Sequence, residues 1–551
     1  MKMTKIKYMA LAAVGTFMMS SCDLDEKFYS EVTPDNFFTS PESVYAVLAK
    51  PFDQWRYYHN EKNNWVLEEL TTDEMACPAR AGDFYNGGEY LRYHYHTWNT
   101  ADRFIVNNFN QLNYVIARSL EAREDLAGVN YQSVGLTEEE KADHLNQINT
   151  LIAYCYMRGL NSYGGLPIYT SSQDKPKARN SRKENFDFIE SVLIDAIPKL
   201  KPRVSLSEAQ NGYITRGTGA MLLAQLYLNA DVFIGENRYS DAEKLLQDIY
   251  EGVYGKYEID PSWSGPHDFD NDRSPEAMWY VPSQTTKKEF DGLYRFMFIA
   301  DAKTYFDCNV LANPYNGYQL APSYEKEGVE LVSKLGRTYS KFHDLDLRKK
   351  PYVYNGNKQY EGMFCVGLQK NPHTGKVAKG TKLQNGKEMV LVDYINRTGN
   401  KSDMMEGDEN SGIRLVKMPV SNSADKDILF DADFPVIRFT EVVYNLAECK
   451  FRRGDKKGAA ELINDVRKRN FANGIDPDPV TEANLDIYRL ADEYMIEFLG
   501  EGHRRTDLIR FGLFTTESWW DHTPTDDTKK VFCIPLEAIQ GNPLLQQNPG
   551  Y

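Results

Sequence analysis

The sequence predicts a mainly α-helical protein: a tetratricopeptide-like scaffold of helix pairs carrying a large loop-rich insertion with short strands and helices. Apolar residues recur at helical spacing through much of residues 22–254 and 436–551. Residues 255–435 are instead rich in Gly, Pro, Asn, Tyr and Asp, with few long periodic runs. A chain of 551 residues can bury a large core, so we expect one large domain, or a few closely packed subdomains, over residues 22–551.

The first residues predict a lipoprotein signal. Three lysines within the first seven residues precede an apolar run at 8–19, which is too short to span a bilayer as a helix. The run ends at Ser20-Ser21-Cys22, and small residues before a cysteine are typical of bacterial lipoprotein signals. We therefore expect residues 1–21 to be removed and Cys22 to be lipidated. Because Ser21 is less usual there than Gly or Ala, the alternative is a cleaved signal with an incidental cysteine.

Three helices are predicted early in the chain. Apolar residues spaced at i, i+3, i+4 and i+7 favour helices over 104–120 and 137–160, and another helix is expected over 186–200. The second of these is followed by Gly164-Gly165 and Pro167, which are strong signals for the end of a helix.

Two pairs of shorter helices resemble repeat units. Residues 220–230 and 242–249 each gather apolar side chains on one face and are joined by a polar turn. Residues 442–447 and 459–466 form a second such pair around the turn at Gly454-Asp455. The first pair looks like one tetratricopeptide unit, because small residues occur where its helices would cross. Helix pairs are therefore expected on both sides of the insertion.

Two segments have the composition of loops that carry binding residues. Residues 53–100 share the character of the insertion, 255–435, in which the fragment 388–392 has the pattern of a strand. Binding residues occur more often on loops held by a rigid scaffold than on the scaffold helices themselves. We therefore look for a binding site in these two segments.

Charge and cysteine content exclude several classes of protein. The formal net charge of −15 argues against nucleic acid or anionic lipid as a partner, because both require basic patches. No cysteine lies in a CxxC pair, so a zinc site or a dense disulfide framework is not indicated. Cys155 and Cys449 fall in apolar helical patterns and are expected to be buried thiols. One or two disulfides among the cysteines are the alternative. The cysteines after Cys22 are Cys77, Cys155, Cys308, Cys365, Cys449 and Cys533.

Several segments, in this order behind the signal, resemble the SusD/RagB family of Bacteroidetes nutrient-binding lipoproteins. Those that carry the resemblance are Cys22-Asp23-Leu24-Asp25, Tyr154–Leu160 continuing into Tyr163–Ile168, Pro435–Val442, Ala447-Glu448, Ile463–Arg467, Glu501–Leu508, Ile534-Pro535, Asn542-Pro543 and Gln547–Tyr551.

The resemblance implies a surface lipoprotein with a binding function. Members of the family have a right-angled scaffold of tetratricopeptide-like helix pairs and cover a SusC-type TonB-dependent transporter in the outer membrane. They bind oligosaccharides or, in the RagB branch, peptides, and the resemblance implies neither catalysis nor a cofactor. A glycan-cleaving enzyme and a repeat adaptor that binds only the transporter are the other hypotheses.

Two regions match positions that line the sugar site of starch-binding members. In the first, Asp73 would accept hydrogen bonds from sugar hydroxyls and Trp98 would stack on a sugar ring. The alternatives are a helix or turn cap for Asp73 and a packed core aromatic for Trp98. Arg80 would bind a hydroxyl or an acidic sugar, and its alternative is an ordinary surface ion pair.

The second region is Asn313–Tyr318. The Asn-Gly pair in it forces a tight turn, which we expect to present Tyr318 outward for stacking. Starch-binding relatives often have Trp where this chain has Tyr, so the glycan is left open. Phe290 and Tyr294 are candidates for a third ring.

No metal site is expected. The alternation of Asp268, Asp270 and Asp272 resembles a calcium loop, but Arg273 stands where the loop requires Gly, and Trp279 where it requires Glu.

Catalytic motifs are missing from the sequence. It contains no HExxH, GxSxG or Walker A motif. His503, Arg504 and Asp507 look reactive, but they lie in a segment of the family resemblance, and we expect ion pairs of the scaffold there. We therefore expect a binding protein without catalytic residues.

Overall fold

The computed structural model of the chain describes residues 37–60, 62–80, 82–311, 314–395 and 403–551. The expected signal peptide and lipidated Cys22 lie outside these ranges. No helix among the described residues is long and apolar enough to cross a membrane.

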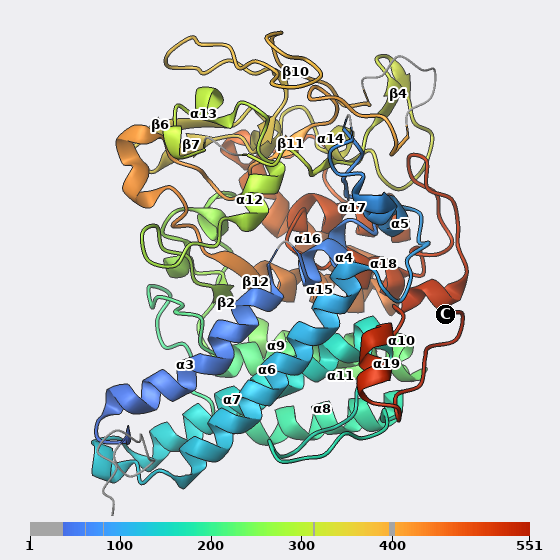
Figure 1. Ribbon diagram of the computed structural model, residues 1–551. Helices are drawn as coiled ribbons and strands as arrows, with labels where there is room; N and C mark the ends of the chain where they lie inside the picture. Colours follow the sequence, from blue (N-terminus) through green and yellow to red (C-terminus); the bar gives the residue numbers. More distant parts are fainter. Residues whose placement is uncertain (1–36, 61, 81, 312–313, 396–402) are drawn as a thin grey trace, which may run out of the picture.

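The scaffold is a continuous array in which eight helices pack each against the next. The first four are the long helices in the lower half of Figure 1. The array confirms the predicted mainly helical fold, including the three early helices and both later pairs. In packing order the helices are α3 (Pro41–Tyr58), α6 (Arg103–Gly128), α7 (Glu138–Tyr163), α8 (Arg182–Ala196), α9 (Arg216–Leu228), α11 (Tyr239–Tyr250), α15 (Phe439–Arg452) and α16 (Lys456–Arg467).

Local signals explain where these helices begin and end. Thr137 accepts a hydrogen bond from the backbone N–H of Glu140, whose side chain accepts one from Thr137, so a capping box starts α7. The helix ends at Gly164, whose φ of 74° is left-handed. Shorter helices complete the scaffold. They are α4 (Asn64–Glu69), α5 (Glu89–His94), α10 (Ala230–Ile234), α17 (Ile487–Phe498), α18 (Arg504–Phe511) and α19 (Leu536–Gly541).

The loop-rich part of the chain contains short helices and strands. Strand β2 (Ala277–Val281) pairs antiparallel with β12 (Phe434–Arg438), and both are largely buried. The helices between them are α12 (Gly292–Met297), α13 (Ala302–Tyr305) and α14 (Thr338–Lys341). The strand expected at 388–392 is present only as β10 (Val390–Leu391). The exact limits of the insertion stay a prediction.

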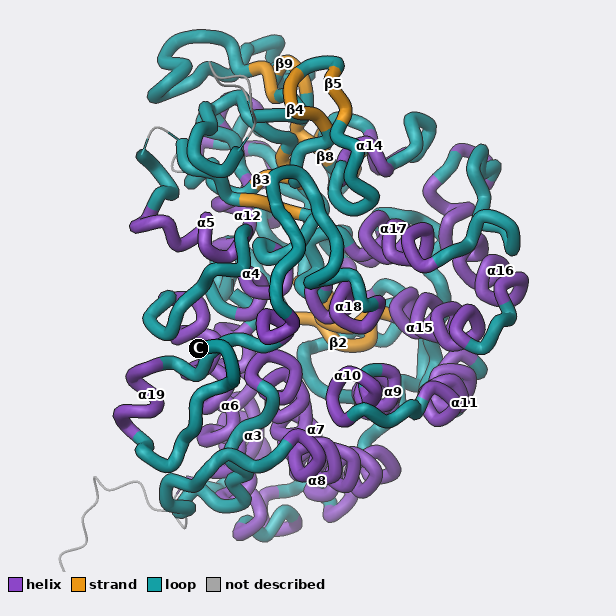
Figure 2. Tube along the Cα trace, turned by 90° about the vertical axis from the view of Figure 1, so that its right-hand side faces the viewer, coloured by secondary structure: helices purple, strands orange, loops and turns teal. Residues whose placement is uncertain are grey.

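Five further two-stranded antiparallel sheets lie in the described residues, and Figure 2 shows their strands gathered away from the long helices. The pairs are β1 (Met75–Ala76) with β3 (Gln319–Leu320), β4 (Tyr324–Lys326) with β5 (Val329–Glu330), β6 (Val353–Gly356) with β7 (Gln359–Glu361), β8 (Phe364–Cys365) with β11 (Arg414–Leu415), and β9 (Gly367–Leu368) with β10.

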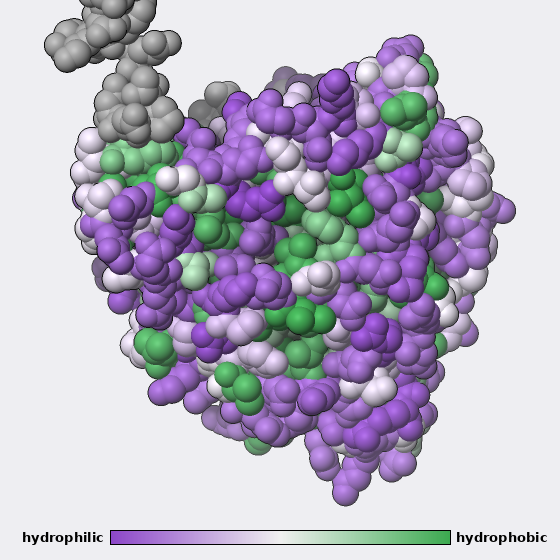
Figure 3. All heavy atoms as spheres, turned by 90° about the horizontal axis from the view of Figure 1, so that it is seen from below, coloured by the Kyte–Doolittle hydropathy of each residue, from purple (hydrophilic) through white to green (hydrophobic). Residues whose placement is uncertain are grey.

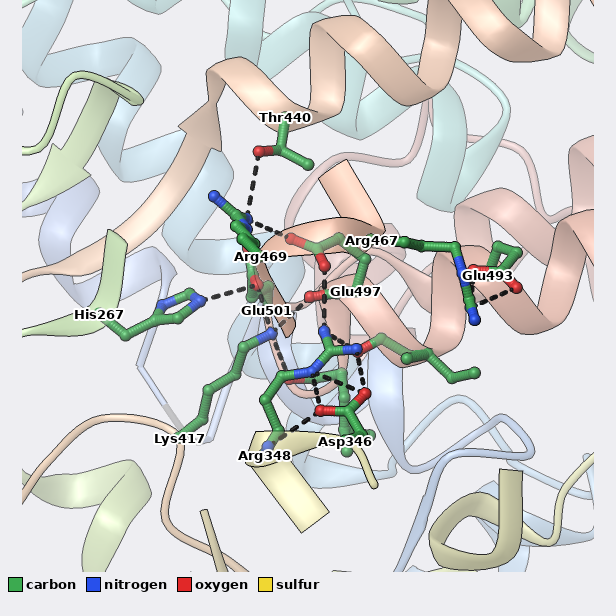
Figure 4. Close-up of polar contacts among 12 residues, drawn as sticks. His267, Asp346, Arg348, Lys417, Thr440, Arg467, Arg469, Glu493, Glu497 and Glu501 are labelled. Atoms are coloured by element: carbon green, nitrogen blue, oxygen red, sulfur yellow. Dashed lines mark hydrogen bonds and ion pairs between the residues drawn. The ribbon is translucent and has the colours of Figure 1, made fainter. Parts of the chain in front are cut away.

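A buried network of charges ties the loop-rich part to the scaffold (Figure 4). Arg438, at the end of β12, donates to Glu497 at 2.8 Å and to Glu501 at 2.9 Å. Lys417 reaches Glu501 at 2.5 Å, and Arg348 reaches Glu497 at 3.0 Å. Because all five side chains are almost completely buried, each charge depends on its partners.

The surface seen from below is mainly hydrophilic, with apolar residues in small groups (Figure 3). Cys155 and Cys449 are buried free thiols, as predicted, and the four other described cysteines are also buried and free. No disulfide is present among the described residues.

Candidate ligand-binding surface

The first part of the candidate site is the loop after β1. Arg80 and Asp83 exchange backbone hydrogen bonds of 2.8 and 2.9 Å and so close a tight turn. Phe84 follows with a φ of 61°, a left-handed conformation that is unusual for a bulky residue. Such strain persists only where the surroundings enforce it. The ring of Phe84 lies against Gly317, where a Cβ would stand 2.6 Å from it, so glycine is needed at that position.

The second part is the loop at residues 315–318, which lies after α12 in the chain. The backbone N–H of Tyr315 donates to the carbonyl of Arg295 at 2.7 Å. The N–H groups of Gly317 and Tyr318 both donate to the carbonyl of Phe296 at 2.8 Å. These bonds fix the loop against the C-terminal end of α12, and the pairing of β1 with β3 brings it next to the Phe84 loop.

Aromatic rings from the two loops and α12 form one connected group. The ring centroid of Phe296 lies 4.7 Å from that of Tyr315 and 6.2 Å from that of Phe84. Tyr315 is 48% exposed, Tyr85 is 45% exposed, and Phe84 is partly exposed. Phe296 is buried beneath Tyr315 and Phe84, and Tyr85 is the exposed neighbour of Phe84 in the chain. We call Phe84, Tyr85, Phe296 and Tyr315 the aromatic platform.

Charged groups lie beside the platform in the chain. Asp83, just before Phe84, forms an exposed ion pair with Lys382. Arg295, just before Phe296, pairs with Asp291 at 2.5 Å. Aromatic rings offer an apolar face, and such neighbouring groups offer hydrogen bonds. The arrangement suits a ligand that has an apolar face and a polar rim.

All six residues proposed from the sequence as ligand contacts are buried. Asp73 accepts from the guanidinium of Arg504 at 2.8 and 2.9 Å, and from the backbone N–H of Gly336 at 2.9 Å. Burial opposes ionisation of Asp73, but the charge of Arg504 outweighs it and the pKa is lowered. Asp73 therefore joins the core to α18.

The ion pairs expected around His503 are confirmed, because His503 binds Asp507 at 2.7 Å.

Trp98 packs in the core, which was the alternative considered for it. Its indole is 3% exposed and donates from Nε1 to the hydroxyl of Tyr551 at 2.6 Å. Its ring lies 4.9 Å from that of Phe532. These contacts attach the C-terminal segment, and the ring has no surface on which a ligand could stack.

The expectation that the Asn-Gly turn presents Tyr318 outward is wrong. The ring is fully buried, stacked between Phe296 at 4.6 Å and Trp65 at 5.1 Å. Tyr315, at the other side of the turn, is the residue that faces solvent.

Phe290 and Tyr294 are also buried, and neither belongs to the platform. The ring of Phe290 lies 5.3 Å from that of Phe434. The ring of Tyr294 stacks on Phe430, with centroids 6.1 Å apart.

Arg80 is buried rather than part of a surface ion pair. It donates to the side chain of Gln319 at 2.5 Å and to the carbonyl of Ser411 at 3.1 Å, and it also donates to the carbonyl of Asp408. Burial lowers its pKa to about 10. Arg80 thus anchors the loop that carries Phe84. A direct ligand contact of any of the six residues stays a prediction.

One aspartate of the calcium-like pattern is engaged by a cation. Asp270 pairs with Lys358 at 2.5 Å. Within the described ranges, no group of three or more His, Cys, Asp or Glu residues could hold a metal ion.

The model of the SusD family matches residues 275–551, which is half of the chain, and the chain belongs to the SusD family. Starch-binding protein SusD of Bacteroides thetaiotaomicron is 26% identical over 442 residues, covering 76% of this chain and 75% of that protein. SusD-like protein P25 of Formosa agariphila is 22% identical over 584 residues, covering 98% of each.

Solved structures share the fold. Surface glycan-binding protein A from Bacteroides fluxus superposes with a TM-score of 0.66 at 18% identity, covering 93% of this chain and 100% of that one. NanU of B. fragilis superposes with a TM-score of 0.66 at 17% identity, covering 95% and 99%. At these identities the likeness shows the fold alone.

Proposed function

We propose that this protein is a cell-surface glycan-binding lipoprotein that captures oligosaccharides on the aromatic platform and delivers them to a SusC-like TonB-dependent transporter. The observation that carries the proposal is the exposed ring of Tyr315, which packs with Phe84 on the buried ring of Phe296. Tyr85, next to Phe84 in the chain, is also exposed. Similarity to starch-binding protein SusD over three quarters of the chain supports the class of ligand.

The platform suits a sugar for physical reasons. The C–H face of a pyranose is apolar and packs on an aromatic ring, while its hydroxyl groups bind to polar groups around it. The rings of Phe84 and Tyr315 pack on the buried ring of Phe296, so the platform is preformed and little entropy is lost when a ligand binds. Binding on such a surface requires no catalytic group, and we propose that the ligand leaves unchanged.

The location of the protein is part of the proposal. Cys22 would carry the lipid that holds the protein at the outer face of the outer membrane, and residues 1–21 would be the signal peptide. The net charge of −15 is compatible with neutral glycans and disfavours nucleic acid.

A binding survey on protein lacking residues 1–22 tests the function. We expect at least one polysaccharide from a panel of starch, plant and host glycans to retard the protein in affinity gels, without release of new reducing ends. Binding of peptides alone would favour a RagB-like function, and sustained release of reducing ends would identify an enzyme. A separate test is co-purification of the full-length lipoprotein with the transporter from outer membranes, and loss of the transporter on washing would contradict the delivery step.

A further inference from the structure

A cavity of about 670 Å³ lies where the scaffold meets the loop-rich part. Its walls come from α3, the loop 209–213, the segment after β2 and the segment before β12. No residue of the aromatic platform lines it. Cavities of this size at the junction of structural units commonly hold small ligands.

One wall of the cavity carries carboxyl groups held in place by the backbone. Oδ1 of Asp433 accepts from the N–H of Ser283 at 2.6 Å, and Oδ1 of Asp431 accepts from the N–H of Thr285 at 2.8 Å. Among the described residues, no group binds the Oδ2 atom of either aspartate. Burial, with the nearby charge of Asp272, raises the pKa of Asp433 to about 8. At neutral pH its carboxyl group is therefore largely protonated and can donate a hydrogen bond as well as accept one.

A second part of the lining is aromatic. Trp55 is almost completely buried and stacks on Trp279 with centroids 4.3 Å apart. Its Nε1 lacks a hydrogen-bond acceptor among the described residues, although buried indole N–H groups usually have one. Phe52 and Tyr213 pack edge to face at 5.3 Å beside it. Because Nε1 of Trp55 is buried, this part of the lining offers a ligand only an apolar surface.

Two of the three cations that line the cavity are engaged by protein groups. Arg56 donates to the carbonyls of Pro282 and, at 2.9 Å, Lys288. The ammonium group of Lys288 pairs with Asp53. Four aspartates and three basic residues line the cavity, so its charges nearly balance and it does not favour a strongly charged ligand.

We propose that this cavity is a second binding site, which holds the terminal sugar of a glycan or a free mono- or disaccharide. Hydroxyl groups of the sugar would bind to the carboxyl groups of Asp431 and Asp433, and its apolar face would pack on Phe52. The proposal rests on the proposed function for the class of ligand. In this arrangement the open platform binds the middle of a long glycan, and the cavity binds the end of a glycan.

Short sugars test the cavity separately from the platform. Protein lacking residues 1–22 is titrated with glucose, galactose, mannose, xylose, maltose and cellobiose, and saturation-transfer NMR and calorimetry measure binding. Asp431→Ala removes an acceptor, and Asn211→Trp fills the entrance from an exposed position. Each should weaken binding of the short sugar at least about tenfold. The matched control Asp427→Ala changes an exposed aspartate of the same segment and should bind as the wild type does.

The outcomes separate the two proposals. The double variant Tyr85→Ala/Tyr315→Ala should keep its affinity for short sugars while losing long glycans. If the wild type binds long glycans but none of the six sugars, or if folded Asp431→Ala and Asn211→Trp both bind as the wild type does, the cavity proposal is overturned and the proposed function stands. Binding of short sugars without any binding of long glycans would overturn the platform instead.

Discussion

Replacing Glu497 by alanine should lower the free energy of unfolding more than a substitution on the protein surface does. Arg348, Arg438 and Arg469 all donate to this buried carboxylate. Burial opposes its ionisation, but the three guanidinium groups outweigh burial and lower its pKa from 4.5 to about 2. One pKa unit corresponds to about 1.4 kcal/mol, so ionised Glu497 stabilises the fold by about 3 kcal/mol.

The alanine variant would leave three buried cations short of a partner. Removal of one member of a buried ion pair costs about 3–5 kcal/mol, and we expect a loss of that size in the free energy of unfolding. Guanidinium denaturation at pH 7, followed by circular dichroism, measures it. The control is Glu461→Ala, which removes an exposed ion pair with Lys457 at 3.9 Å and should cost less than about 0.5 kcal/mol.

The same carboxylate makes stability depend on pH. The folded pKa of Glu497 lies below its ordinary value, so its stabilisation is present above about pH 4.5 and is lost as the pH falls towards 2. The variant should lose less stability than the wild type over this range. A loss below about 1 kcal/mol at pH 7, together with an unchanged acid profile, would refute the role of the network.

Three further predictions concern single side chains. Gly317→Val should displace the ring of Phe84 and weaken glycan binding in calorimetry at least about tenfold, with the fold retained in circular dichroism; unchanged affinity would contradict the preformed platform. Despite burial, Asp507 raises the pKa of His503 to about 9, so stability from this pair is complete below about pH 6.5 and is lost up to pH 9; thermal melts of His503→Gln should lack this alkaline loss, and an identical melting profile would argue against it. Trp98→Phe removes the indole donor to the C-terminal tyrosine and should cost about 1 kcal/mol in denaturation without changing glycan affinity; reduced affinity would restore Trp98 as a ligand contact.

The scaffold is predictable from the sequence because its signals are local. Periodic apolar residues, the capping box at Thr137 and the left-handed Gly164 determine α7 without reference to the rest of the chain. The buried thiols Cys155 and Cys449 follow from the same periodicity.

The candidate site is predictable only as far as its loops. The segments around Asp73 and Tyr318 do meet, through the pairing of β1 with β3. Which ring faces solvent depends on contacts remote in sequence: Trp65 covers Tyr318, whereas Tyr315 has no such cover. The burial of Trp98 likewise depends on the docking of the C-terminal segment, more than 400 residues away in the chain. Neither contact can be predicted from the local sequence pattern.

The left-handed backbone at Phe84 is a second feature that the sequence hides. A phenylalanine gives no sign of a positive φ, and Gly317, the small residue against which its ring lies, is in another loop. The two rings left exposed, Tyr85 and Tyr315, therefore become visible as a site only in the folded chain.

The most direct test of the account is the affinity of the Tyr85→Ala/Tyr315→Ala variant for whichever polysaccharide the wild type binds. Calorimetry should show a loss of at least about 2 kcal/mol, or about 30-fold, with an unchanged melting temperature. The control Tyr114→Ala removes a tyrosine of α6 that is 55% exposed and should bind as the wild type does. Wild-type affinity in the folded double variant would contradict the assignment of the aromatic platform as the glycan-binding surface.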